Sequence, residues 1–210
     1  MSCRALAPDF DAVIAIEVIV PDSGRVEVGD TLRPHARALN GRGDSTAATI
    51  VWSALDTTIQ VVDSFAGTTV GLIAGQSGRI QARVGSLRSN PVTITILARL
   101  DSIQATGPDT VAAPAPDSLS DSLKIQAFGP AGSVAGRSIG LTITFPAGAA
   151  GLTLVPGDTV RTNGSGIAIF QVRASGISRP DTVMVAATAQ HADGSPVPGS
   201  PVTFVVEFLP

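Results

Sequence analysis

Two histidines are the side chains of this 210-residue chain best suited to acid–base or metal chemistry. Neither His35 nor His191 has a cysteine or carboxylate at the spacing that a metal site uses. Serines are plentiful, but no Gly-x-Ser-x-Gly elbow leads from a strand into a helix, because GSGIA at 164–168 leads into another strand pattern. We therefore predict no catalytic residues, no metal and no cofactor, and interpret the chain as non-enzymatic.

The tripeptide Arg42-Gly43-Asp44 matches the best-known cell-adhesion signal. It lies in ALNGRGDSTAATIVWSALD at 38–56, between two stretches with strand character. Asn40-Gly41 already favours a turn there, and any such loop needs polar, Gly-rich residues. We interpret the tripeptide as part of a turn and keep adhesion as the weaker alternative.

A cationic stripe is a second candidate surface. Arg33, His35 and Arg37 alternate with apolar residues, so they share one strand face. Such a stripe is typical of a solvated face, and the alternative is a face that docks an acidic partner.

Apolar residues continue to the end of the chain in VTFVVEFLP. Phe208 and Leu209 are therefore candidate interface residues, and the charge-poor segment at 145–157 is a second apolar feature. The alternative is that both belong to core-facing strands and their hairpin.

The single cysteine, Cys3, cannot form an internal disulfide. Ser2-Cys3 and a short Pro-containing tether over residues 1–12 resemble the start of a mature bacterial lipoprotein, whose cysteine carries the lipid. An ordinary exposed cysteine near a chain end is the equal alternative, since Met1 belongs to the chain. The run VIAIEVIV at 13–20 is too short to span a bilayer and contains Glu17, so we predict no transmembrane segment.

The composition limits the class of protein. A net charge of −3, with 14 basic and 17 acidic residues, offers no patch for binding phosphates, so we predict no nucleic-acid partner. Small aliphatic residues and 22 glycines suit strands and tight turns.

Period-2 apolar runs separated by Gly, Pro, Asn, Asp and Ser predict an all-β protein. Two series of strands follow one another and meet in ILARLDSIQA, which divides the chain into domains at 13–98 and 99–210. The predicted strands are near 13–20, 31–39, 49–54, 58–63, 68–73, 79–84 and 92–98, then 100–106, 121–128, 139–145, 152–155, 158–162, 167–174, 182–190 and 202–208.

Alternation within these strands predicts which side chains are buried. Trp52 is expected in the core with Ile80 and Ala82. In the second series the expected core residues are Leu141, Ile143, Phe145, Ile167, Ile169 and, after a local irregularity in the strand, Val172.

Several motifs resemble the bacterial immunoglobulin-like domain of group 2: VGDT at 28–31, the ALNGRG loop, the VWS strand, and VDS before a Gly-rich turn. This resemblance covers 13–98 and departs from the family at Pro34, where it predicts a bulged or edge-like strand. The second half, through LKIQAFG, GDTVRTNGSGIAIFQVRAS and DTVMVAATAQHADGSPVPGSPVTFVVEF, resembles the group 1 domains of invasin- and intimin-like proteins.

The resemblance implies two Ig-like antiparallel β-sandwiches in tandem, in an exported bacterial protein that acts by surface contact. We expect a periplasmic or cell-surface protein, membrane-associated, that serves as an accessory or stabilising subunit of a membrane-embedded envelope complex. The alternative is a surface adhesin or a fragment of an adhesin stalk, whose native gene is longer.

Overall fold

The computed structural model describes residues 9–113, 119–148, 151–175 and 181–209. Within these ranges the chain is all-β, with one turn of 3-10 helix, η1 (Asp22–Gly24). None of the described helices could cross a membrane. Contacts divide the chain into an N-terminal unit, Met1–Leu97, and a C-terminal unit, Ala98–Pro210.

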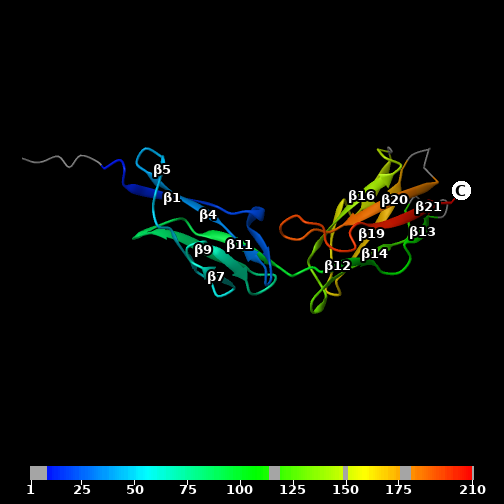
Figure 1. Cartoon of the computed structure of the whole chain (residues 1–210). Coiled ribbons are helices and arrows are strands. Elements are labelled where there is room, and N and C mark those ends of the chain that lie inside the picture. The colour runs from blue at the N-terminus through cyan, green and yellow to red at the C-terminus, as the bar shows by residue number, and fades with distance from the viewer. Residues whose placement is uncertain (1–8, 114–118, 149–150, 176–180, 210) are drawn as a thin grey trace, which may run out of the picture. The chain divides into compact units, whose positions relative to one another are not determined.

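The N-terminal unit is a sandwich of short strands. They pair as β1-β4-β5, as β3-β8-β7, and as β10-β9-β11-β2 with β6 also on β9 (Figure 1). Apolar side chains that alternate along these strands meet between the sheets and form the core. The strands are β1 (Val13–Ile19), β2 (Arg25–Glu27), β3 (Thr31–Leu32), β4 (His35–Asn40), β5 (Ser45–Thr46), β6 (Val51–Ala54), β7 (Ile59–Asp63), β8 (Thr68–Gly71), β9 (Ser77–Val84), β10 (Leu87–Arg88) and β11 (Val92–Leu97).

The C-terminal unit is a sandwich of two five-stranded sheets, β12-β14-β19-β17 with β15 on β14, and β13-β21-β20-β16-β18. Phe170 on β19 and Phe204 on β21 meet edge to face across the core, with ring centroids 5.2 Å apart. The strands are β12 (Ser102–Ala105), β13 (Thr110–Ala113), β14 (Leu123–Gly129), β15 (Gly132–Ser133), β16 (Ser138–Phe145), β17 (Leu152–Val155), β18 (Thr159–Arg161), β19 (Ile167–Ala174), β20 (Thr182–Thr188) and β21 (Val202–Phe208).

Both units are therefore immunoglobulin-like sandwiches, as predicted. Among the strands named above, pairing is antiparallel except for β2 with β11 and β13 with β21. Neither β2 nor β13 was predicted, because each is short and finds its partner far along the chain. Strand β13 even lies in the Pro-rich stretch at 106–121, which reads locally as a loop.

Pro34 divides the strand that was predicted over 31–39. Before it, β3 pairs with β8; after it, β4 pairs with β1. Proline has no N–H to donate to a ladder, so the chain changes sheets here with little loss of hydrogen bonding. The irregularity expected at Pro34 is thus a break in the strand.

The predicted faces hold in the N-terminal unit, where Trp52, Ile80 and Ala82 are buried. In the C-terminal unit the prediction for β19 is wrong for Ile167 and Ile169 and correct for Val172, which is fully buried. Its core residues are Ala168, Phe170, Val172 and Ala174, whereas Ile169 is 46% exposed and Ile167 half-buried. In the first half of this strand both faces carry apolar residues. Further along, Gln171 and Arg173 lie on the face of Ile167 and Ile169 and mark it as the outer one.

Phe145 is also misassigned, for a different reason. Ile143 pairs with Val185 and Phe145 with Met184, so the ladder passes over Thr144. Such a β-bulge adds one residue and reverses the facing of every side chain after it. Phe145 consequently lies on the outer face, 53% exposed.

The apolar tail is largely core. Phe208 is only 4% exposed because it follows Phe204 and Val206 on the inner face of β21. It is therefore not an exposed interface residue, which corrects that prediction. Leu209, one residue later, is exposed.

Truncating neighbouring residues of β19 tests which face is buried. Phe170→Ala should lower the free energy of unfolding of the C-terminal unit by about 3–5 kcal/mol, because it leaves a cavity beside Phe204. Ile169→Ala should change it by no more than about 0.5 kcal/mol. Urea unfolding followed by far-UV circular dichroism, with hydrogen exchange of the β19 amides, measures both; equal losses would reverse the assignment.

Candidate interaction surface

An open hollow lies on the surface of the N-terminal unit. Its volume is about 370 Å³, which suits one or two side chains of a partner rather than a large ligand. It lies where β4 begins after the break at Pro34, beside β6 and the turn after β7. The lining residues are Pro34, His35, Ala36, Ala48, Ile50, Trp52, Phe65 and Ala66.

Phe65 stands at this hollow with 70% of its surface exposed, the largest exposed fraction among the large apolar residues described. The buried Trp52 forms part of the lining. Gly67 makes room for the indole, because a Cβ at this position would lie 2.8 Å from Trp52 Nε1. A buried and an exposed aromatic ring thus share one hollow.

Asp63 holds the turn that carries Phe65. Its Oδ1 accepts hydrogen bonds from the backbone N–H groups of Phe65 and Ala66, both at 2.9 Å. These bonds favour the ionised carboxylate and lower the pKa of Asp63. The N–H of Trp52 donates to the carbonyl of Ser64 at 2.7 Å, so the exposed ring is carried by an ordered turn.

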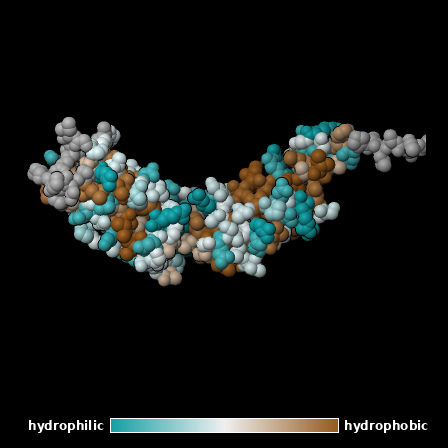
Figure 2. All heavy atoms as spheres, turned by 180° about the vertical axis from the view of Figure 1, so that it is seen from behind, coloured by the Kyte–Doolittle hydropathy of each residue, from teal (hydrophilic) through white to brown (hydrophobic). Residues whose placement is uncertain are grey.

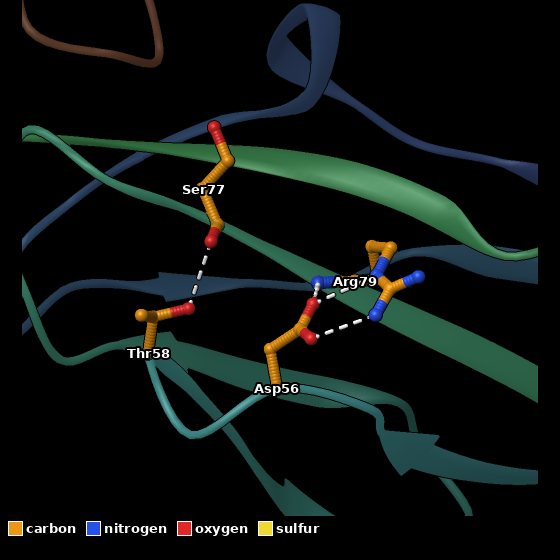
Figure 3. A network of polar contacts seen from close by, with 4 residues as sticks. All are labelled: Asp56, Thr58, Ser77 and Arg79. Carbon is orange, nitrogen blue, oxygen red and sulfur yellow. Dashed lines mark hydrogen bonds and ion pairs between the residues drawn. The ribbon is translucent and has the colours of Figure 1, made fainter.

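Asp56 fixes the connection between β6 and β7, the two strands that lead into this site (Figure 3). Arg79 donates to the Asp56 carboxylate from its backbone N, at 2.8 Å, and from Nε and Nη2, both at 2.9 Å. The side-chain bonds from Arg79, followed by the backbone bond, lower the pKa of Asp56 to about 2. Thr58 Oγ1 adds a bond to the Ser77 carbonyl at 2.9 Å.

The cationic stripe is exposed but partly neutralised. Register places Glu17 of β1 opposite Arg37 of β4, and the two side chains form an ion pair. Arg33 lies close enough to Asp63 to contribute to the lowered pKa of that carboxyl. His35 is the member of the stripe that also lines the hollow.

Arg42-Gly43-Asp44 lies in the turn between β4 and β5, and all three residues are exposed. The Asn40 side chain accepts from the backbone N–H groups of Arg42, at 2.9 Å, and Asp44, at 3.0 Å. Gly43 has φ +84°, which a residue with a side chain rarely adopts. The tripeptide therefore belongs to a turn, as the sequence predicted, and the two hydrogen bonds to the Asn40 side chain hold the turn in place.

The remaining predicted positions contribute no further site. Cys3 lies outside the described residues. Part of the predicted tether contacts the N-terminal unit, because the N–H of Gly41 donates to the Phe10 carbonyl at 2.9 Å. Among the described residues, no three His, Cys, Asp or Glu side chains are grouped closely enough to hold a metal ion.

Sequence reasoning did not single out Phe65 or Met184. A large aromatic in the Gly-containing turn DSFAG at 63–67 was a usable signal for Phe65. Met184 reads as an ordinary strand residue. Figure 2 shows that apolar side chains form patches on the visible face of each unit.

No protein-family model matches the chain, and no curated protein sequence matches it. Solved structures with similar folds include the adhesin InvE of Yersinia pseudotuberculosis, 14% identical over 91% of this chain and 58% of that chain, with a TM-score of 0.44. The D00-D0 domain of intimin is 18% identical over 93% and 100%, with a TM-score of 0.34. The fibronectin(III)-like modules of Clostridium thermocellum CbhA are 11% identical over 91% and 94%, with a TM-score of 0.39.

This chain therefore spans less than two thirds of the InvE chain. With each of these TM-scores below 0.5, the similarities assign neither a function nor a partner to it.

The lowered pKa of Asp56 predicts a pH dependence of stability. The folded carboxyl titrates at about 2 and the ordinary value is 3.8, so its contribution is present above about pH 4 and is lost as the pH falls through 2. Carboxyl NMR should give a midpoint near 2, and Asp56→Asn should remove this part of the pH dependence of urea unfolding. A midpoint near 3.8 would show that the Arg79 bonds do not persist in solution.

Proposed function

We propose that this chain is a non-catalytic bacterial protein that acts outside the cytoplasm by contact with other proteins, as a membrane-attached accessory subunit that stabilises a larger envelope complex. The observation that carries the proposal is Phe65, an exposed aromatic ring on an ordered turn beside an open hollow. Aromatic residues at the centre of an interface dominate many protein–protein contacts.

The geometry of this site suits a protein partner. The hollow is large enough for a side chain of the partner, while the ring of Phe65 packs against the partner's surface around it. Because Asp63 already orders the turn, little conformational entropy is lost when the contact forms. Burial of a Phe side chain contributes about 1.5–3 kcal/mol.

The domain types and the anchor are part of the same proposal. The motifs at 13–98 support a group 2 bacterial Ig-like domain, and those at 99–210 support a group 1 domain. Cys3 is the proposed lipid attachment point, which places the protein on a membrane in the periplasm or at the cell surface. Leu209, Arg33 and His35 are additional contact residues in this proposal.

Purification of the chain from native membranes in mild detergent tests the proposal. Mass spectrometry should find a membrane complex in stoichiometric amounts. Phe65→Ser should reduce recovery of that complex by roughly 30-fold, the equivalent of about 2 kcal/mol for an interface aromatic.

Ile73→Ser, at an exposed apolar residue that does not line the hollow, is the matched control and should leave recovery unchanged. Recovery of the chain alone, or as part of a longer surface polypeptide, would refute the accessory-subunit proposal.

A surface adhesin, or a fragment of an adhesin stalk, is the second candidate, favoured by the exposed Arg42-Gly43-Asp44 turn. In that case animal cells should adhere to the immobilised chain, and Asp44→Glu or a soluble Arg-Gly-Asp peptide should abolish the adhesion. If the wild-type chain and Asp44→Glu support equal adhesion, and the peptide has no effect, the tripeptide is a turn only.

A further inference from the structure

The outer face of the sheet β13-β21-β20-β16-β18 is nearly free of charge. Its five strands contain two charged residues, Arg161 and Glu207, and both are exposed. The other outward side chains are small, hydroxylated or apolar. By alternation with the buried positions, they are Thr110, Ala112, Ser138, Gly140, Thr142, Phe145, Thr159, Thr182, Met184, Ala186, Thr188, Thr203 and Val205.

An apolar row crosses this face. Phe145 pairs with Met184, which in turn pairs with Val205, so three apolar side chains stand side by side on β16, β20 and β21. Phe145 joins the row because the bulge at Thr144 turns it outward. With 53% of Phe145 and 37% of Met184 exposed, the row is available to a partner.

The two charges lie near opposite ends of the strands: Arg161 on the edge strand β18, and Glu207 on β21, one strand in from the other edge. Arg161 pairs with Ser138 of β16, and two residues further along β16, Gly140 pairs with Thr188 of β20. Arg161 therefore lies two residue spacings beyond Thr188 along the strand direction. Glu207 pairs with Thr182, six residues from Thr188 along β20. At about 3.4 Å per residue, the two charges are separated by roughly 27 Å along the strands, and by three strand spacings of about 4.8 Å across them.

We propose that this face packs against the same face of a second copy of the chain, related by a twofold axis. The axis lies in the plane of the interface, perpendicular to the line that joins the two charges and through its midpoint. Rotation about it brings Arg161 of each copy opposite Glu207 of the other. Opposite charges near the two ends of the face and uncharged residues between them make the face complementary to itself.

The size of the face determines how tight the contact is. Five strands at about 4.8 Å and about eight residue spacings at about 3.4 Å give at most roughly 24 by 27 Å, or about 1,300 Å² in total for two copies. This is at the lower end for specific interfaces, so the dimer should be weak and reversible. The face is separate from the hollow that supports the proposed function, so either proposal can fail while the other stands.

Charge reversal provides a direct test by sedimentation equilibrium of the purified full chain. The wild-type chain should show a reversible monomer–dimer equilibrium below millimolar concentration. Arg161→Glu and Glu207→Arg should each weaken dimerisation by about tenfold or more, since each places like charges opposite one another twice. Far-UV circular dichroism establishes that each variant is folded, a necessary control because Arg161 also donates to the Gly136 carbonyl.

An equimolar mixture of the two single variants is the decisive sample. One copy then carries Glu at 161 and 207 and the other carries Arg at both, so a mixed dimer restores both pairs and should form as well as the wild-type dimer. Met184→Glu should abolish dimerisation, whereas Ile169→Glu, a similarly exposed residue on the other sheet of the same unit, should leave it intact.

A chain that stays monomeric up to millimolar concentration would overturn the proposal. So would a dimer that tolerates Met184→Glu, or single variants that do not recover on mixing. The co-purification experiment with Phe65→Ser reports on the other unit and leaves this result unaffected.

Discussion

Contact between the inner faces of two sheets is the interaction on which each unit depends. Small aliphatic side chains at every second position pack into a core, and Trp52 or the Phe170–Phe204 pair supplies its bulk. A strand that buries one face leaves the other free, so the same alternation that stabilises the fold also creates its outer surfaces. The function of such a chain is therefore to be sought on those surfaces and at the places where alternation is interrupted.

Two interruptions shape the candidate surfaces. At Pro34 the chain leaves one sheet and enters another, and the hollow opens beside this break. At Thr144 a bulge turns Phe145 away from the core and into line with Met184. Both lie next to exposed aromatic or apolar side chains. Interruptions of this kind commonly mark functional edges of β-proteins.

Polar residues in the turns act differently: their hydrogen bonds fix the conformation of the turns that connect the strands. Asp63, Asp56 and Asn40 each accept two or more hydrogen bonds from nearby N–H groups. None of these residues belongs to a group with catalytic geometry. The Arg42-Gly43-Asp44 turn is held in the same way, by hydrogen bonds to the Asn40 side chain, so its polar and Gly-containing sequence suits a turn.

Strand positions, the all-β class and the burial of Trp52 follow from the sequence, because period-2 patterning and Gly- or Asn-rich turns are local properties. The sequence also indicated that the strand at Pro34 is irregular. It could not indicate β2 and β13, whose parallel partners lie far along the chain. In β19, Ile167 and Ile169 favoured the wrong face, although Gln171 and Arg173 lie on that face too.

Only the tertiary structure decided which apolar residues are exposed to solvent. Phe208 and Phe145 look alike in sequence, yet the regular register of β21 buries the first and a one-residue bulge exposes the second. Likewise Arg37 became an ion-paired residue only through its register with Glu17. The physical reason is that exposure and pairing depend on ladder register and on which strand lies alongside, and these are set by packing over the whole sheet.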